Sequence, residues 1–304
     1  MNADLSTALL WVALMLAGVA ATGHVHRHLG VLLASQGIVM SLSALTDALL
    51  VRHGLSPVIA LLAGLAVAAA LGLIHIPVLV RTGPGLLLLL TALGQVVLVE
   101  LWISLPEFTG GSGGLILPVA LSRFDIGAAA AVCVGAAAYA VWVVQAPRMA
   151  FEWPCLRSLG RQAGVFGVPV RPRYLAAFLV YGLLVGTTGL IATRHLGYLS
   201  VSSFGLSWSL TVVMVVLASR DYPVLSGVVF CSLYAGLRVL LRQSVHASTA
   251  WANLFELAFP LCLLLLSDPF PEGPTSEPAP PDVTDPEDHS YETPPFYDGT
   301  GVPQ

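Results

Sequence analysis

The chain has 304 residues, of which 56% are hydrophobic and only 10% are charged, and its mean hydropathy is +0.84. A soluble domain carries about 25% charged residues, so charge is too scarce here to cover a water-facing surface. All 13 basic residues are Arg, and nine of the 17 acidic residues lie from Asp268 onward, where there is no Arg. The composition excludes an ordinary soluble protein. Nucleic-acid binding is also excluded, because no Arg-rich face is interleaved with exposed aromatic residues.

A helix needs about 20 mostly apolar residues to cross the hydrocarbon core of a bilayer. Such runs predict eight or nine spans, of which the seventh is short: Leu5–Gly23, Leu29–Leu50, Leu55–Val80, Gly85–Leu105, Asp125–Gln145, Tyr174–Thr193, Phe204–Ser219, Pro223–Leu241 and Ala250–Leu266. The expected fold is therefore all-α, a polytopic membrane helix bundle of 8–9 transmembrane helices that occupies residues 1–267.

The densest Arg cluster sets the expected orientation. It lies in the polar stretch 146–173, which the positive-inside rule places in the cytoplasm. The loops 106–124 and 194–203 then lie outside, although Arg194 falls on the wrong side of this assignment. The tail, residues 268–304, is rich in Pro and acidic residues and has little to bury, so it is expected to be disordered and cytoplasmic. It is either a solvated extension or a docking segment.

The polar stretch 146–173 predicts a short basic helix between two spans. Pro154 can start this helix, because a first-turn proline loses no needed N–H group. Arg157 and Arg161 are four residues apart and share one face, and Tyr174 is expected to begin the next span. Two interpretations stay open. The stretch is either a loop made basic only to set topology, or a coupling helix that docks in a groove of a motor subunit.

Several sequence blocks occur in the order found in one family of permeases. The outer block comprises Thr109–Leu115 and Pro118, and the cytoplasmic block comprises Arg157, Arg161, Ala163, Gly164, Phe166–Val168 and Arg173–Phe178. The later block comprises Gly182, Gly186, Gly189, Gly197, Ser202–Phe204, Ser209 and Val212–Leu217. From about residue 80 to residue 242 the chain thus resembles the branched-chain amino acid type of ABC importer permease. It departs from that family at Ala218–Pro223, which replaces a glycine-rich turn.

The resemblance implies a multi-pass subunit of the bacterial cytoplasmic (inner) membrane that moves branched-chain amino acids or a similar small polar solute. The chain itself is then no enzyme and holds no cofactor or metal, because ATP is hydrolysed on separate ABC ATPase subunits. Further implied partners are a homologous second permease, expected as a heterodimer, an extracytoplasmic solute-binding protein and membrane lipid. The resemblance places the ATPase contact at Glu152, Arg157, Arg161, Gly164 and Gly167.

The substrate path is expected at an outer glycine-rich turn, an intramembrane acid and a Ser-Phe turn. The residues concerned are Thr109, Gly110, Gly111, Ser112, Gly113, Glu100, Ser203 and Phe204. The glycines would let the backbone of a re-entrant turn approach the path, although a flexible outer loop has the same composition. They form no phosphate loop, because the Gly-Lys-Ser/Thr ending is missing.

Other polar residues within apolar runs receive structural interpretations. Asp47 lies near the outer end of its span and is expected to snorkel, and His75 is expected to be packed at a kink before Pro77. Gly182, Gly186 and Gly189 suit close helix packing. His24, His26 and His28 alternate in what is expected to be a short cytoplasmic loop, where alternation does not predict a metal site.

Two rival functions remain open from the sequence. An ion-coupled secondary transporter needs membrane-buried acids, for which Glu100 and Glu256 are the candidates. A degenerate permease that acts as a non-transporting scaffold would use the tail to recruit partners, and the departure at Ala218–Pro223 favours this rival a little.

Overall fold

The structure is a computed structural model that describes residues 2–117, 147–200, 203–218, 229–234 and 258, all within the unit Met1–Ser267. The described part is mostly helical, as predicted. Its elements are α1 (Asn2–Leu29), α2 (Gln36–Arg52), α3 (Pro57–Thr82), α4 (Pro84–Ser104), α5 (Pro106–Thr109), η1 (Gly111–Gly113), β1 (Leu115–Ile116), α7 (Pro147–Leu159), η2 (Gly160–Phe166), α8 (Val170–Leu196), β2 (Tyr198–Leu199) and α9 (Leu206–Ala218).

Three of these helices, α3, α4 and α8, are long and apolar enough to cross a membrane. The predictions of a span at Asp125–Gln145, of most of the last two spans, of the residues that follow Ala218 and of a disordered tail lie outside the described residues. The total of eight or nine spans therefore stays a prediction.

Turn-forming residues set the ends of the long helices. The Ser56 hydroxyl accepts a hydrogen bond from Ile59 N–H at the start of α3, with Pro57 in the first turn. Gly83, at φ 80°, separates α3 from α4. Gly197, at φ 64°, ends α8 and donates its N–H to the Thr193 carbonyl at 2.9 Å. Positive φ values of this kind favour glycine, which lacks a Cβ.

Two predicted helix starts were wrong. Helix α7 begins at Pro147, so Pro154 lies inside it and not in its first turn. The next span, α8, begins at Val170 and not at Tyr174. Pro172 therefore lies within the first turn of α8, where a helix tolerates proline because its N–H group needs no intrahelical partner.

The predicted continuous span Leu29–Leu50 was also wrong. The backbone leaves the helical conformation between the end of α1 at Leu29 and the start of α2 at Gln36. Gly30 adopts φ 68° at the exit and donates its N–H to the His26 carbonyl at 2.9 Å. Val31, Leu33, Ala34 and Ser35 are nonetheless buried. We call residues 30–35 the helix break.

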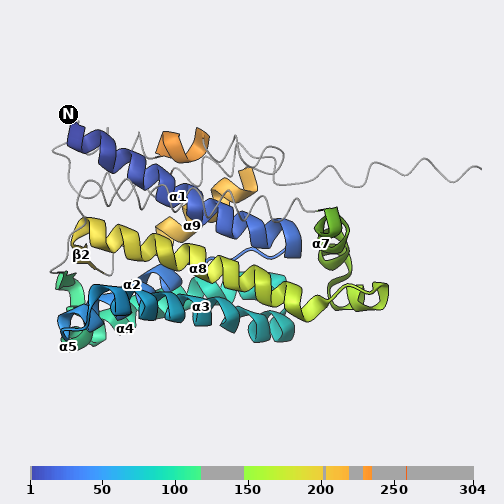
Figure 1. Cartoon of the computed structure of the whole chain (residues 1–304), viewed down its shortest axis with the longest axis horizontal. Coiled ribbons are helices and arrows are strands. Elements are labelled where there is room, and N and C mark those ends of the chain that lie inside the picture. Colours follow the sequence, from blue (N-terminus) through green and yellow to red (C-terminus); the bar gives the residue numbers. More distant parts are fainter. Residues whose placement is uncertain (1, 118–146, 201–202, 219–228, 235–257, 259–304) are drawn as a thin grey trace, which may run out of the picture. The chain divides into compact units, whose positions relative to one another are not determined.

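Helix α8 packs against α1, α2 and α3 and lies between α1 and the other two in Figure 1. The prediction that Gly182, Gly186 and Gly189 permit close packing is confirmed. A Cβ built on Gly189 would lie 2.6 Å from Met40 Cα, and one on Gly182 would overlap the Ala68 carbonyl and come within 3.0 Å of Gly72 Cα. Small residues let the helix backbones approach this closely.

A buried ion pair joins α2, α3 and α8 at one end of the bundle. Arg194 donates from Nε to Asp47 Oδ2 at 3.0 Å and from Nη2 to Asp47 Oδ1 at 2.7 Å, and Nη2 also donates to the Pro57 carbonyl. The Asp47 side chain is 1% exposed and that of Arg194 is 13% exposed. The expectation that Asp47 snorkels was therefore wrong, because a cationic partner from α8 meets it inside the protein.

We expect Gly182→Ala to lower the free energy of unfolding by about 1–3 kcal/mol, because the added methyl group overlaps backbone atoms of α3 that cannot move freely. Gly85→Ala is the matched control, since no atom lies within 4 Å of a Cβ built there. Thermal unfolding of the two purified proteins by far-UV circular dichroism makes the comparison. Equal melting temperatures for the two variants would contradict the described packing.

We expect Asp47→Asn to cost about 3–5 kcal/mol of stability, because it leaves the Arg194 guanidinium buried without its anion. The double variant Asp47→Leu, Arg194→Met removes both charges and should unfold at a higher temperature than either single variant. A double variant that is no more stable than the weaker single variant would show that the pair contributes through something other than charge.

Candidate functional site

Two backbone N–H groups, one in the helix break and one in the first turn of α2, are satisfied by hydroxyl groups from distant helices. The Ala34 N–H donates to Thr91 Oγ1 of α4 at 3.1 Å, and the Gly37 N–H donates to Ser209 Oγ of α9 at 2.9 Å. Non-helical backbone at membrane depth persists only where protein groups or water satisfy it. In transporters such breaks occur where a substrate or ion binds.

Two glutamine side chains flank the break. Gln36 Nε2 donates to Thr22 Oγ1 at 2.7 Å and to the Leu33 carbonyl at 3.0 Å, whereas Gln95 Nε2 donates to the Phe204 carbonyl at 3.0 Å. Both residues are at most 1% exposed. Within the described part of the chain, the amide oxygen of each is buried without a hydrogen-bond partner. The break is thus surrounded by polar groups, and two of its hydrogen-bond acceptors, the amide oxygens of Gln36 and Gln95, have no partner among the described residues.

A cavity of about 180 Å³ lies beside the first turn of α2. Three polar residues line it, Ser35, His75 and Thr91, and its other walls are aliphatic residues of α2, α3 and α4. Ser35 Oγ lies 2.9 Å from the hydroxyl oxygen of Tyr181 on α8. Tyr181 lies eleven residues into α8, about 16 Å from the start of that helix at 1.5 Å per residue. The contact between Ser35 and Tyr181 beside the cavity therefore lies well away from the end of the bundle along its length.

His75 occupies a fixed position at this cavity. Its ring stacks on Phe178 at 6.0 Å between centroids and 3° between planes, and meets the edge of Tyr181 at 5.9 Å. Its Nδ1 lies 3.1 Å from the Gly72 carbonyl oxygen. The expectation of a packed polar residue is confirmed, and α3 continues through Pro77. The cavity wall that His75 forms was not expected.

A second feature is the knob, which we define as α7 and η2, residues 147–166. Trp153 packs against two histidines of α1, with centroid distances of 4.7 Å to His28 and 5.8 Å to His24. The carboxylate of Glu152 pairs with the guanidinium of Arg173 on α8. The knob is therefore held to the ends of two bundle helices, α1 and α8.

Histidines 24 and 28 lie on one face of α1, which continues to Leu29, so the expectation of a loop there was wrong. Their rings meet edge to face at 4.9 Å. Both lie beyond the predicted span Leu5–Gly23. Burial lowers the pKa of His24 to about 4. Burial, followed by the neighbouring charges of His24, Arg27 and Arg157, lowers the pKa of His28 to about 3. Both rings are therefore neutral at pH 7.

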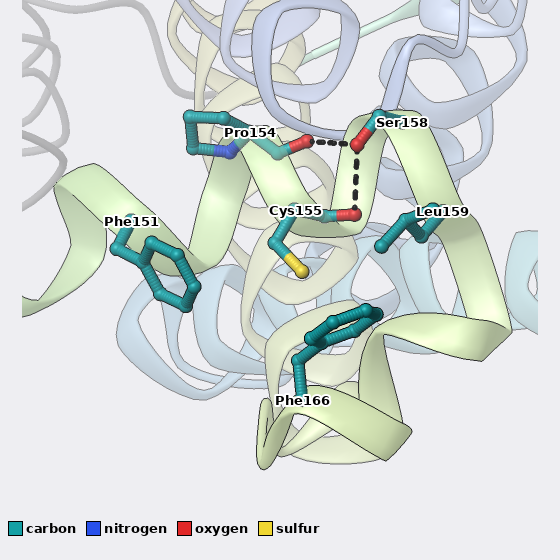
Figure 2. Close-up of a pocket in the computed structure, with 6 residues that line it drawn as sticks. All are labelled: Phe151, Pro154, Cys155, Ser158, Leu159 and Phe166. Carbon is teal, nitrogen blue, oxygen red and sulfur yellow. Dashed lines mark hydrogen bonds between the residues drawn. The ribbon is translucent and has the colours of Figure 1, made fainter. Parts of the chain in front are cut away.

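The surface of the knob carries an apolar hollow of about 360 Å³. Figure 2 shows its lining side chains, which are Phe151, Pro154, Cys155, Ser158, Leu159 and Phe166. Ser158 Oγ donates to the Pro154 carbonyl at 2.9 Å, so its polar atom is committed within the helix. Phe151 is 64% exposed and Phe166 is 62% exposed. Exposed aromatic side chains around a hollow are typical of a protein-interaction site.

The predicted ATPase-coupling residues all lie on the knob or at its end. Glu152 is committed to Arg173, and Arg157 is exposed, with its Cγ 3.6 Å from a Cβ built on Gly30. Gly164 is exposed within η2, and Gly167 ends η2 at φ 77°. Arg161 lies in η2, and only its backbone is described. Sequence reasoning missed the aromatic hollow. Phe151 lies in α7 and Phe166 lies at the end of η2, and only the turn between these elements places both side chains around one hollow.

The predicted outer glycine loop forms an ordered turn. Gly110, Gly111 and Gly114 all have positive φ values. Thr109 Oγ1 lies 2.6 Å from the Trp102 carbonyl oxygen and accepts a hydrogen bond from Gly111 N–H at 3.1 Å. Strand β1, which follows the turn, pairs antiparallel with β2, with Leu115 opposite Leu199. The two loops predicted to lie outside are therefore joined.

The structure brings only part of the predicted substrate path to the helix break. Phe204 is fully buried and its carbonyl binds Gln95, and Ser203 Oγ accepts from Ser200 N–H nearby. Ser112 and Gly113 are exposed at the glycine turn, and Glu100 is exposed on α4. The residues at the break that were missed are Ser35, Gln36, Thr91, Gln95 and Tyr181, and their only sequence signal is a polar residue in an apolar run. Ser209, which also lies there, was noted only as part of the family resemblance.

The described residues form a mostly α-helical fold with three helices able to cross a membrane, an internal polar break and a helical knob. No protein-family model matches the chain, and no curated protein or solved structure matches it.

We expect the stability of the protein to fall as the pH drops from 7 toward 5. Buried neutral histidines bind fewer protons in the folded state than in the unfolded state, whose histidines titrate near pH 6.5. Below that pH the unfolded state gains protons first, so acid favours unfolding. The double variant His24→Phe, His28→Phe should flatten the dependence of melting temperature on pH.

His53→Gln is the control for this experiment, since His53 is exposed. It should keep the full pH dependence. If the His24→Phe, His28→Phe variant retains the wild-type slope between pH 7 and pH 5, the two rings are not buried as described.

Proposed function

We propose that this chain is the permease subunit of an ATP-binding-cassette importer for branched-chain amino acids or a similar small polar solute. The observation that supports the proposal most is the knob with its exposed apolar hollow. A permease that receives work from a separate ATPase needs a rigid protrusion on the cytoplasmic side. Phe151 and Phe166 offer apolar surface to such a partner, and Arg157 and Arg171 add exposed charge nearby.

The attachment of the knob supports this role. Trp153 contacts α1 through His24 and His28, and Glu152 holds Arg173 on α8. A displacement of the knob would therefore be transmitted to both α1 and α8. Helix α1 leads directly into the helix break, and α8 carries Tyr181, which meets Ser35 of the break. Closure of two ATPases could thus bias the access of the interior through a contiguous set of packed elements.

The rival of an ion-coupled transporter finds less support among the described residues. Such a transporter needs a membrane-buried acid that can release its ion or proton. Asp47 is buried, but both of its oxygens bind Arg194. Glu100 is exposed on α4, and Glu256 lies outside the described residues. The scaffold rival rests on the tail and on the residues after Ala218, which also lie outside them.

The proposal includes the rest of the assembly. A second permease would pack beside this one in the cytoplasmic membrane, two ATPases would dock on the knobs, and a solute-binding protein would deliver solute from outside. ATP would bind to the ATPases and not to this chain.

The test is isolation of the complex in a mild detergent from cells that express the tagged chain. We expect an ATPase subunit with a phosphate-binding loop to co-purify in stoichiometric amount, and the complex to hydrolyse ATP. Phe166→Glu should reduce the recovered ATPase at least tenfold, because it places a charge in an apolar contact. Gln162→Glu is the matched control, an exposed knob residue that adds the same charge and does not line the hollow.

Comparable loss of ATPase in both variants would indicate a general charge effect and would remove the support drawn from the hollow. Absence of any ATPase from the wild-type preparation, under conditions in which the permease stays folded, would overturn the importer proposal.

A further inference from the structure

We propose that the cavity beside the helix break binds a small uncharged solute with an aliphatic body and an N–H or O–H donor in its head group, which His75 Nε2 accepts. The inference rests on the proposed transport function and adds a site within a single permease chain. The main observation behind it is that His75, whose Nε2 has no hydrogen-bond partner among the described residues, lies beside aliphatic walls in the same cavity.

The walls of the cavity favour an aliphatic body. Helix α2 contributes Ile38 and Val39, α3 contributes Leu71, and α4 contributes Leu87 and Leu90. Burial of aliphatic groups against such walls is favourable by about 25 cal/mol per Å² of apolar surface. A volume of about 180 Å³ is smaller than the 300–1,000 Å³ (roughly) of pockets for drug-sized ligands. The site therefore accepts a solute of few heavy atoms.

The polar atoms of the cavity leave one acceptor uncommitted. Thr91 Oγ1 accepts from Ala34 N–H and donates to the Leu88 carbonyl. The Gly72 carbonyl can only accept, so His75 Nδ1 carries the proton that it receives. In the neutral ring Nε2 then has a lone pair, and no described residue hydrogen-bonds it. His75 is only 6% exposed and lines the cavity, so this lone pair is left for a molecule in the cavity.

Ser35 can supply the complementary donor. Ser35 and Tyr181 share one hydrogen bond between two hydroxyl groups. In the arrangement in which Tyr181 donates, the Ser35 proton is left for the cavity. A head group that both donates and accepts, such as a primary amide or an alcohol, would then meet His75 and Ser35 together.

The charges around the cavity argue against an ion. No charged side chain lines the cavity, and the buried Asp47 and Arg194 neutralise each other. An ionic solute would lose its hydration without an opposite charge to replace it. A solute without ionised groups avoids this penalty.

Access to the cavity comes from the face shared by α3 and α4. Ile74 is 57% exposed and Leu90 is 40% exposed, and both line the cavity. A solute can therefore enter without unfolding of the bundle. A lipid chain could enter by the same route, and the experiment has to separate the two.

The experiment follows the imidazole nitrogens of the protein by NMR. The full-length chain is labelled with ¹⁵N-histidine and placed in lipid nanodiscs, and the spectrum of His75→Gln identifies the His75 signals. Isovaleramide is the probe, because it combines a branched aliphatic body with a neutral N–H donor. N,N-dimethylisovaleramide is the matched control, because it keeps the body and the carbonyl and has no donor.

We expect a saturable shift of the His75 Nε2 signal with isovaleramide at tens of millimolar, and none with the dimethyl compound at the same concentration. Leu71→Phe, which narrows the cavity, should abolish the shift while the His75 signal and the melting temperature show an intact fold. Isovalerate and isoamylamine, the charged analogues, should cause no shift.

No saturable shift with isovaleramide would overturn the proposal, and so would equal shifts with both amides, because the donor would then be irrelevant. A shift that depends on acyl-chain length in the nanodisc and not on the amide would assign the cavity to lipid and also overturn it. The measurement needs no ATPase, so its failure is separate from failure of the importer proposal, which the co-purification decides.

Discussion

The helix break is the constraint on which the rest of the described structure depends. The break interrupts the helical hydrogen bonds between α1 and α2, and each unsatisfied buried group costs about 1–3 kcal/mol. Thr91 of α4 therefore accepts from Ala34 N–H in the break, and Ser209 of α9 accepts from Gly37 N–H in the first turn of α2. Helix α8 brings Tyr181 to Ser35, and it can do so because its glycines allow contact with the backbones of α2 and α3.

Hydropathy predicted those elements whose environment is uniform along their length. The expected spans Leu55–Val80 and Gly85–Leu105 agree with α3 and α4 to within two residues at each end. The break was missed for a physical reason. Averaged over a window, Gly30, Ser35 and Gln36 are outweighed by the aliphatic residues around them. What makes the break possible is a set of hydroxyl groups from residues 91, 181 and 209, and a sequence alone does not show which distant residues meet.

Charged residues also show that a sequence does not reveal which distant residues meet. Asp47 and Arg194 each have an unfavourable position when considered alone, one as an acid in a span and the other as a base on the outer side. Together they are a bidentate pair that also binds the Pro57 carbonyl. The positive-inside rule counts Arg residues as if each faced water. It therefore misassigns an Arg whose position is set by a partner within the protein.

The break and the knob are connected through the same two helices. Helix α1 contacts the knob through His24 and His28, and the break begins at Gly30, directly after the last residue of α1. Helix α8 contacts the knob through Arg173 and the break through Tyr181. Tyr181 of α8 and Thr91 of α4 contact Ser35 and Ala34, so the break lies between a helix that contacts the knob and a helix that holds its other side. A displacement of α8 relative to α4 would therefore change the polar interior.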